Sequence, residues 1–376
     1  MRAVRLLDRY IGRQLLVTAL FAIVVLSVVL VLGNIFKKLL DLLVNQNAPA
    51  SLILSFIAYV LPFSLTFTIP WGFLTSVLLV FGRMSAESEL TALRSNGVSI
   101  SRACVPVWGL AAVFTAICLW INMDVAPRAQ QQMKDALFNI ATSNPLAMFG
   151  TDKVIEDFPG HVIYVEKTDG KKLTNLLVYK IDEDTKTLMS VMFAREGWLE
   201  LGAGKVKNSN GVEEDEKQII LRYRDGRYEQ RDEEHPDELS RLRNGIVVAE
   251  GSVGIPLKTL YEKKQKAGGV SGMALKELMA TEKSGKTIEF NKRLSNALAT
   301  FAFALLAVPL AITAQRKETS VGFVISLAIG LVYYLFFFLT DMARNRPHLH
   351  PELLVWVPNI VFLTIGAVRF AKLARR

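Results

Sequence analysis

The sequence has little cysteine and little histidine. Only two cysteines and four histidines occur among 376 residues. Cys104 and Cys118 lie in one uncharged stretch, 14 residues apart, which is about 21 Å along a helix axis. That distance is too long for a disulfide within the chain. A small disulfide-framework fold is therefore excluded, and the remaining parts of the chain must be stable without such a bridge.

The sequence also lacks a catalytic constellation, with neither a Cys–His arrangement nor a Gly-x-Ser-x-Gly motif. His348, His350 and Glu352 are candidate metal ligands, but no further ligands cluster nearby, so we favour a solvated loop. Residues 280–287, ATEKSGKT, match a loosened P-loop pattern. A helical pattern precedes them, where phosphate binding requires a strand. We expect no enzymatic activity, no metal and no cofactor in this chain.

Charge is missing from six long stretches of a chain that is 51% hydrophobic. They span residues 14–36, 42–82, 103–123, 294–315, 319–340 and 353–368. A helix needs about 20 residues to cross the bilayer core, and Glu352 and Arg369 can extend the shorter last run by reaching the interfaces. The first run is too long for a signal peptide. Six buried helices of a soluble protein would need amphipathic punctuation that these runs lack, so we predict six transmembrane helices.

The positive charge belongs to the membrane part of the chain. Residues 126–286 hold 25 Lys/Arg and 26 Asp/Glu, whereas the remainder holds 19 and 9. A nucleic-acid partner is therefore a poor explanation for the net charge. Thirteen of those 19 basic residues fall at the two termini, around residues 83–102 and at 316–317. The positive-inside rule then puts both termini in the cytoplasm and 126–286 outside.

Within residues 126–286 the spacing of apolar residues changes from a helical pattern to the alternation typical of strands. From Val154 onward, short β-rich runs alternate with turn signals such as Asp169-Gly170, Asp225-Gly226 and Asn244-Gly245. Repeated strands of this kind favour an all-β sandwich or jelly roll. We expect three parts: transmembrane helices one to three in 1–125, the β-domain with a connecting helix in 126–286, and helices four to six in 287–376.

The polar stretch GRMSAESELTALRSNGVS, residues 82–99, separates the second and third apolar runs. We expect a short helix at about 84–96, with Ser85 as its N-cap and Asn96-Gly97 as its stop. Glu87 and Glu89 would lie in its first turn and Arg94 in its last turn, where the helix dipole favours these charges. Leu90 and Leu93 would share its apolar face. It could lie on the membrane or in a groove of a cytoplasmic protein. Because the inner leaflet is negative and would repel the two carboxylates, we favour the groove.

Three basic residues near the outer ends of helices are candidate lipid-phosphate ligands. Lys37 and Lys38 follow the first apolar run, and Arg128 follows the third. Adjacent ammonium groups suit phosphate, although we slightly favour snorkelling to headgroups as the explanation of the lysine pair. Pro62 and Pro70 in the second run could be structural kinks or could line a cavity. Glu289 and Arg293, at i and i+4, indicate a local ion pair.

Several segments together resemble the lipopolysaccharide export permease family, LptF/LptG. The stretch at 82–99 is similar to the family's cytoplasmic coupling helix, and further matching segments are LLDRYIGRQLL at 6–16, INMDVAPRA at 121–129 and 289–323. Residues 87–89 and NPLA at 144–147 resemble the LptF branch. The order and spacing of these segments, over almost the whole chain, make the likeness specific.

The resemblance implies a permease subunit of an ABC-type transporter in the bacterial inner membrane, with a periplasmic β-jelly-roll. It implies a homodimeric ATP-binding partner that holds ATP and Mg, a paralogous LptG-like permease, LptC/LptA-like bridge proteins, and lipopolysaccharide as cargo. Glu87, Glu89 and Arg94 would meet the ATPase, and Lys37 and Lys38 would meet lipid A phosphates. An envelope-assembly or sensor protein with the same layout, and a membrane-bound lipid enzyme, stay open as alternatives.

Overall fold

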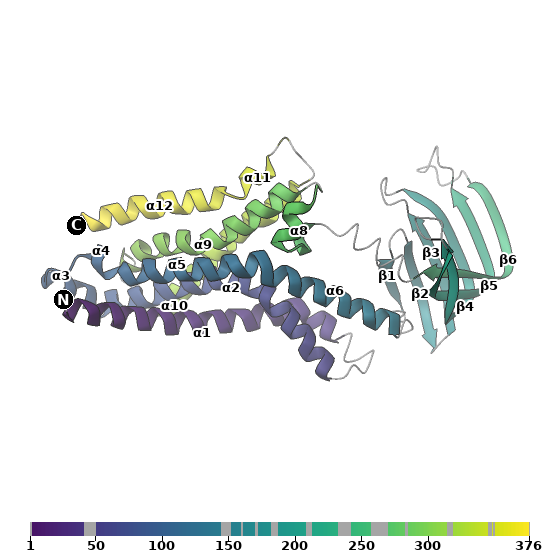
Figure 1. Ribbon diagram of the computed structural model, residues 1–376, viewed down its shortest axis with the longest axis horizontal. Helices are drawn as coiled ribbons and strands as arrows, with labels where there is room; N and C mark the ends of the chain where they lie inside the picture. The colour runs from purple at the N-terminus through teal and green to yellow at the C-terminus, as the bar shows by residue number, and fades with distance from the viewer. Residues whose placement is uncertain are drawn as a thin grey trace. The chain divides into compact units, whose positions relative to one another are not determined.

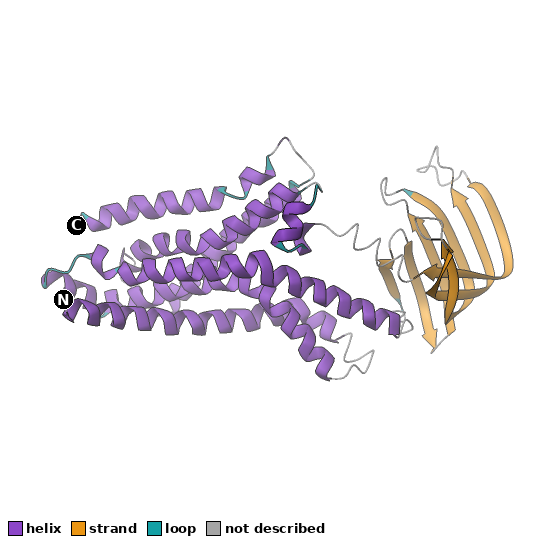
Figure 2. Cartoon of the chain, in the orientation of Figure 1, coloured by secondary structure: helices purple, strands orange, loops and turns teal. Residues whose placement is uncertain are grey.

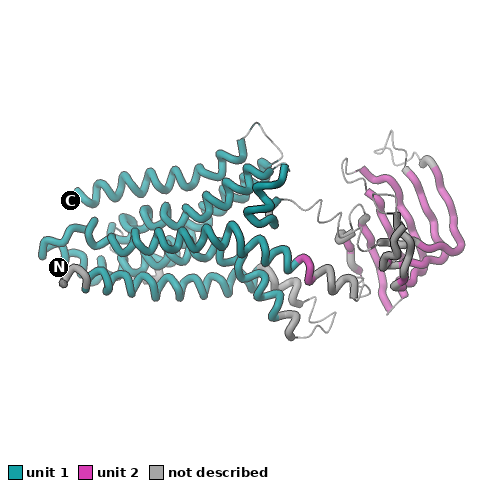
Figure 3. Tube along the Cα trace, viewed as in Figure 1, with its two compact units in different colours: residues 1–40, 48–133, 270–376 teal, residues 41–47, 134–269 magenta. Residues whose placement is uncertain are grey.

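The chain forms two compact units, which are coloured separately in Figure 3. The computed structural model describes residues 2–40, 50–143, 152–158, 161–169, 172–181, 187–207, 213–231, 242–256, 270–282, 285–313, 319–344, 348 and 350–375. The first unit comprises residues 1–40, 48–133 and 270–376, and the second comprises 41–47 and 134–269. The first unit is helical and the second contains the strands (Figure 2).

The helical unit is built from long apolar helices and short connecting ones (Figure 1). In chain order these are α1 (Arg2–Leu40), α2 (Ala50–Ala86), α3 (Glu89–Ser95), α4 (Ile100–Ala103), α5 (Val105–Trp120), the π-helical turn η2 (Ile121–Val125), α6 (Ala126–Ser143), η4 (Val270–Gly272), α8 (Leu275–Ala280), α9 (Lys286–Thr313), α10 (Thr319–Met342), α11 (Pro351–Leu354) and α12 (Val357–Ala374). Among the described residues, six segments are long and apolar enough to span a membrane: 6–33, 54–86, 100–136, 286–313, 322–342 and 351–374. They coincide with the six uncharged runs, which confirms that part of the prediction.

Glycines let the long helices approach one another closely. A Cβ built on Gly72 of α2 would lie 2.6 Å from Ile23 Cγ1 of α1. One built on Gly366 of α12 would lie 2.9 Å from the backbone of Leu305 in α9. In a membrane the hydrophobic effect does not press helices together, so such small residues provide tight van der Waals contact.

Proline leaves a carbonyl of α2 that another helix satisfies. Pro70 has no N–H, so the carbonyl of Thr66, four residues earlier, loses its helical donor. Asn296 of α9 fills the vacancy, donating from Nδ2 to Thr66 O at 2.9 Å, and Cys118 Sγ lies 3.6 Å from the same oxygen. Helices α2, α5 and α9 therefore meet at one backbone atom.

The strands form one antiparallel sheet of six members in sequential order. They are β1 (Lys153–Phe158), β2 (His161–Asp169), β3 (Lys172–Ile181), β4 (Leu188–Lys207), β5 (Glu213–Arg231) and β6 (Leu242–Pro256). A buried cluster that includes Ile163, Val165 and Leu176 packs on one face. A separate antiparallel β-sheet is thus confirmed, whereas the jelly-roll arrangement of two facing sheets stays a prediction.

A crease crosses the sheet at one row of residues. The row takes one residue from each of β2 to β6, and none of these five is paired in the ladders: Glu166, Asn175, Arg195, Asp225 and Ala249. Asn175 and Asp225 have positive φ angles of 53° and 52°, which Asn and Asp tolerate better than other side chains. The buried residues on either side are three positions apart, as Leu173 and Leu176 show on β3. The inward face therefore stays inward although the period-two alternation shifts.

Candidate functional site

The polar stretch between the second and third spans lies at the end of the bundle that holds both chain termini (Figure 1). The predicted start of its helix is wrong. α2 continues to Ala86, because Met84 is fully buried and keeps the chain helical, and α3 begins only at Glu89. Ser85 is consequently a residue of α2, whose hydroxyl donates to Ile312 O of α9 at 3.2 Å. Ser88 takes the N-cap place with φ of 59° and no side-chain cap.

The predicted stop of the helix is confirmed in detail. Asn96 is the C-cap and Gly97 has a φ of 78°. The N–H of Gly97 donates to Arg94 O at 2.9 Å, and the N–H of Val98 donates to Leu93 O at 3.0 Å. This pair of bonds is a Schellman motif, which requires a left-handed residue after the C-cap and so suits glycine. The helix therefore ends at a fixed point and with a fixed exit direction.

The apolar face of α3 turns toward its own bundle. Leu90 is 5% exposed and belongs to the buried core of the helical unit, and Leu93 packs partly against that core. Glu87 and Arg94 are exposed, whereas Glu89 is half-buried. Leu90 and Leu93 thus anchor the helix, where the groove interpretation expected them to meet a partner. The surface that remains for a partner is polar.

Side chains of α1 hold this segment from one side. The contacts are Asp8 with Arg102 at 2.6 Å, Gln14 with Arg83 at 2.7 Å, and the Tyr10 hydroxyl with Glu89 at 3.4 Å. They reach from α1 to the end of α2, to α3 and to α4 in turn. We call residues 83–102, with these contacts, the coupling segment. Polar contacts therefore fasten the coupling segment to α1, in addition to the buried anchor of α3.

Of the three candidate phosphate ligands, Arg128 is the one with a described side chain. Lys37 and Lys38 lie in the last turns of α1, and their side chains are outside the described residues. Arg128 forms an ion pair with Asp124 at 2.7 Å, so its charge is already balanced. The NPLA segment, 144–147, is also outside the described residues.

Two further candidate motifs remain, the histidine pair with Glu352 and the P-loop-like stretch at 280–287. His350 Nδ1 lies 3.2 Å from Glu352, and no group of three or more His, Cys, Asp or Glu that could hold a metal occurs within the described chain. In the P-loop-like stretch, α8 ends at Ala280 and α9 begins at Lys286. The Lys286 ammonium donates to Met279 O at 2.6 Å, which places it against the helix before it.

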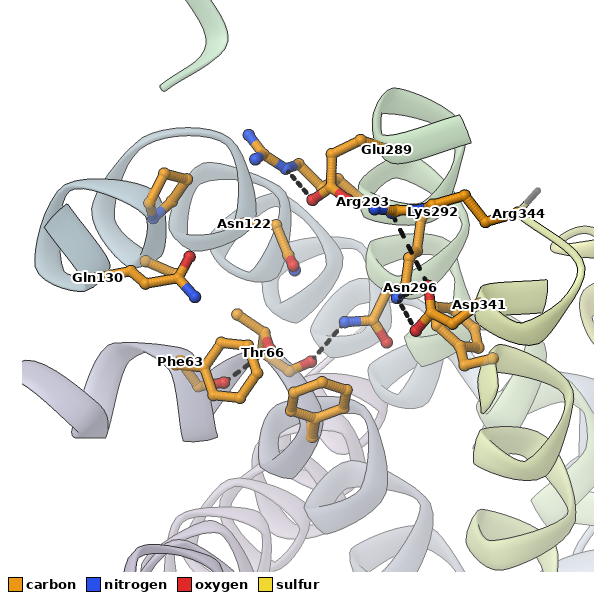
Figure 4. Close-up of a pocket in the computed structure, with 14 residues that line it drawn as sticks. Phe63, Thr66, Asn122, Gln130, Glu289, Lys292, Arg293, Asn296, Asp341 and Arg344 are labelled. Carbon is orange, nitrogen blue, oxygen red and sulfur yellow. Dashed lines mark hydrogen bonds and ion pairs between the residues drawn. The ribbon is translucent and has the colours of Figure 1, made fainter. Parts of the chain in front are cut away.

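A pocket of about 380 Å³, lined by charged, amide and aromatic side chains, lies between α2, η2, α6, α9 and the end of α10. The sequence analysis singled out the helix-bending prolines of α2 and the Glu289–Arg293 pair of α9. It did not predict that the segment between the prolines and this ion pair line the same pocket. Phe63, Thr66 and Phe67, between the two prolines, line the pocket, whereas Pro62 and Pro70 are not among its lining residues. Arg293 Nε lies 3.0 Å from Glu289 Oε1, with both side chains less than 10% exposed. Figure 4 shows the charged residues of α9 and α10 gathered around this pair.

Two comparisons with known proteins bear on the whole chain. The family model described as "Lipopolysaccharide export system permease LptF/LptG" matches residues 9–372. "Lipopolysaccharide export system permease protein LptF" of Escherichia coli (strain K12) is 23% identical over 369 residues, which is 96% of this chain and 93% of the relative. The protein of that name from Shigella flexneri shows the same identity and coverage. Both comparisons include the helical unit and the sheet.

Proposed function

Since the chain belongs to the lipopolysaccharide export permease family, LptF/LptG, we propose that its coupling segment converts ATP hydrolysis in a partner subunit into movement of the helical unit. The chain is a permease subunit of lipopolysaccharide export and a multi-pass inner membrane protein, not an enzyme. ATP and Mg would be held by the partner ATPase, which the family assigns to a separate subunit.

The orientation follows from charge. Both termini and the coupling segment would lie in the cytoplasm, because 13 of the 19 Lys/Arg outside residues 126–286 cluster at those places. The sheet would then lie in the periplasm. A motor in the cytoplasm can reach only the cytoplasmic end of the bundle, so the coupling segment is where force would enter.

The coupling proposal rests on the contrast between the buried and the exposed residues of α3 and of the turn before it. Leu90 is buried in the bundle, while Glu87 and Arg94 lie on the exposed side. A buried anchor with a charged outer face suits a helix that is pushed by one protein and moves another part of its own chain. The Schellman stop and the contacts with α1 keep this short helix from unwinding under load.

We propose that the sheet receives the acyl chains of the cargo. The crease bends five neighbouring strands at the same level, and bends of this kind form the corners at which strands pass from one face of a β-roll to the other. A jelly-roll-like enclosure would present the apolar cluster on the inner side. LptC/LptA-like bridge proteins would then take the lipid onward.

The partners follow from the same family logic. A homodimeric ATPase needs two permease surfaces, so we propose that a paralogous LptG-like subunit pairs with this chain, which would occupy the LptF place. Lys37 and Lys38 would contact lipid A phosphates at the outer end of α1. Arg128, paired with Asp124, is the weakest member of that set.

The test is co-purification of the ATPase with charge-reversed permeases. We expect the double variant Glu87→Lys and Arg94→Glu to retain much less ATPase and to stop lipopolysaccharide transfer, while folding normally because both residues are exposed. Glu282→Lys is the matched control, since this exposed carboxylate precedes α9, far from α3 in Figure 1. Full ATPase retention by the double variant would refute the coupling assignment.

A further inference from the structure

The pocket around Glu289 and Arg293, at the other end of the helical unit, has no place in the coupling mechanism. It lies where α9 begins and α10 ends, opposite the termini (Figure 1). Its ionisable residues are three cations and two carboxylates: Lys292, Arg293, Arg344, Glu289 and Asp341. The formal charge of the lining is therefore +1, in a cavity whose other walls include three phenylalanines.

Two of the three cations are already committed. Lys292 Nζ lies 2.8 and 2.6 Å from the two carboxylate oxygens of Asp341. Arg293 donates to Glu289 at 3.0 Å and to the carbonyl of Met273 at 2.8 Å. Neither side chain can turn to a ligand without losing these bonds.

Arg344 is different. Its Nη2 lies 3.5 Å from Glu289 and 3.8 Å from Asp341, at or beyond the limit of hydrogen bonding. Its Nε is buried without a hydrogen-bond partner among the described residues. A guanidinium held this loosely beside a pocket has donors to spare, and its planar fork matches two oxygens of one phosphate.

Among the described residues, Arg344 offers an unsatisfied donor, whereas Asn296 offers an unsatisfied acceptor. The side chain is only 3% exposed and lines the pocket, with Nδ2 bonded to Thr66 O at 2.9 Å. Its Oδ1 has no hydrogen-bond partner in the part of the chain that the structure describes. A buried amide oxygen without a donor is unfavourable, so a ligand that brings a hydroxyl into the pocket would be stabilised there.

We propose that this pocket binds the headgroup of an anionic glycerophospholipid, with the phosphodiester at Arg344 and a headgroup hydroxyl at Asn296. A phosphodiester carries a single negative charge, which equals the excess positive charge of the lining. The phosphate monoesters of the transported lipid carry about −1.5 to −2 each, which this lining would not neutralise. Figure 4 shows Phe63 across the pocket from the charged residues, where apolar parts of the lipid can pack.

The site would hold a resident lipid, distinct from the cargo. Asn296 lies in α9 and Arg344 lies in the turn that follows α10, so a bound headgroup would link α9 to the end of α10. A pocket of about 380 Å³ lies within the usual range for small-molecule sites, about 300–1,000 Å³. The size suits a glycerol phosphate headgroup better than a phosphorylated disaccharide.

The experiment is native mass spectrometry of the detergent-purified complex, titrated with phosphatidylglycerol or with phosphatidylcholine. We expect the wild type to retain phosphatidylglycerol preferentially, because phosphatidylcholine offers no hydroxyl to Asn296. Arg344→Gln should weaken that retention about tenfold or more, since a charge-assisted bond is lost. The control Arg369→Gln removes an exposed cation of α12 and should change nothing.

Three results would overturn the proposal. These are equal retention of the two lipids by the wild type, unchanged retention by Arg344→Gln, and displacement of phosphatidylglycerol by lipopolysaccharide, which would assign the pocket to the cargo. If Arg344→Gln fails to fold, Arg344→Lys decides the matter. Because this variant keeps the positive charge, phosphatidylglycerol should still raise its melting temperature. If phosphatidylglycerol raises the melting temperature of neither Arg344→Lys nor the wild type, the site is also refuted.

Discussion

The bond between Asn296 and the carbonyl of Thr66 can be tested through the proline that makes it necessary. Asn296→Ala removes the donor at 2.9 Å and leaves a buried carbonyl with only the weak Cys118 thiol, 3.6 Å away. Hydrogen bonds between membrane helices average about 0.6 kcal/mol and reach about 1.7. An unsatisfied buried acceptor costs about 1–3 kcal/mol. We therefore expect Asn296→Ala to lower the free energy of unfolding by about 1–2 kcal/mol.

The second half of the cycle restores the helical donor. In Pro70→Ala the new N–H of residue 70 can bond to Thr66 O, so the same carbonyl is no longer dependent on α9. Asn296→Ala should then cost clearly less in the Pro70→Ala background than in the wild type, with a coupling of about 1 kcal/mol.

The assay is unfolding in mixed micelles of mild detergent and dodecyl sulfate, followed by tryptophan fluorescence. Four proteins are compared: the wild type, the two single variants and the double variant. Additive effects of the two substitutions would refute the reasoning, because they would show that Asn296 stabilises the bundle by something other than the carbonyl that Pro70 exposes.

Two further predictions concern packing and pH. Gly366→Ala should lower the melting temperature, because the added Cβ would lie 2.9 Å from the Leu305 backbone and overpacking costs about 1–3 kcal/mol. Gly109→Ala is the control, since a Cβ there would meet open space. A similar loss in both variants would contradict the close contact. The Lys172 ammonium, 2.6 Å from Glu196, holds the pKa of that carboxyl below its usual range. The pair therefore stabilises the sheet above the unfolded-state pKa of about 4.3 and ceases to do so as pH falls through the lowered value. Circular dichroism of the full chain during acid titration should show a shallower loss of sheet in Glu196→Gln, and an unchanged profile would remove this pair from the acid sensitivity.

The six spans could be predicted from sequence because they depend on one property, the absence of charge over a length fixed by the bilayer. The ends of the short helix were harder. Its stop is local chemistry, Asn96-Gly97, and was predicted correctly. Its start depends on Met84 being buried by residues distant in the sequence, so the local preference of Ser85 for a cap was overridden.

The pocket shows a similar limit. The spacing of Glu289 and Arg293 predicted their ion pair, which the structure confirms at 3.0 Å. The contribution of Arg344 could not be predicted, because it lies 55 residues from Glu289 in sequence and reaches it only through the packing of α10. The spacing in the sequence predicts Arg293 as the partner of Glu289, whereas the approach of Arg344 depends on tertiary contacts.

The crease has a consequence for how this sheet can change in length. Since all five strands shift their alternation at the same level, deleting one residue inside β4 would turn half of that strand inside out relative to its neighbours. Residues can be added or removed at the turns, beyond the ends of the ladders, without that penalty. Insertions tolerated by this domain should therefore concentrate in the connections between strands, and a functional variant with a single-residue deletion next to Arg195 would show that the strands are not held in step.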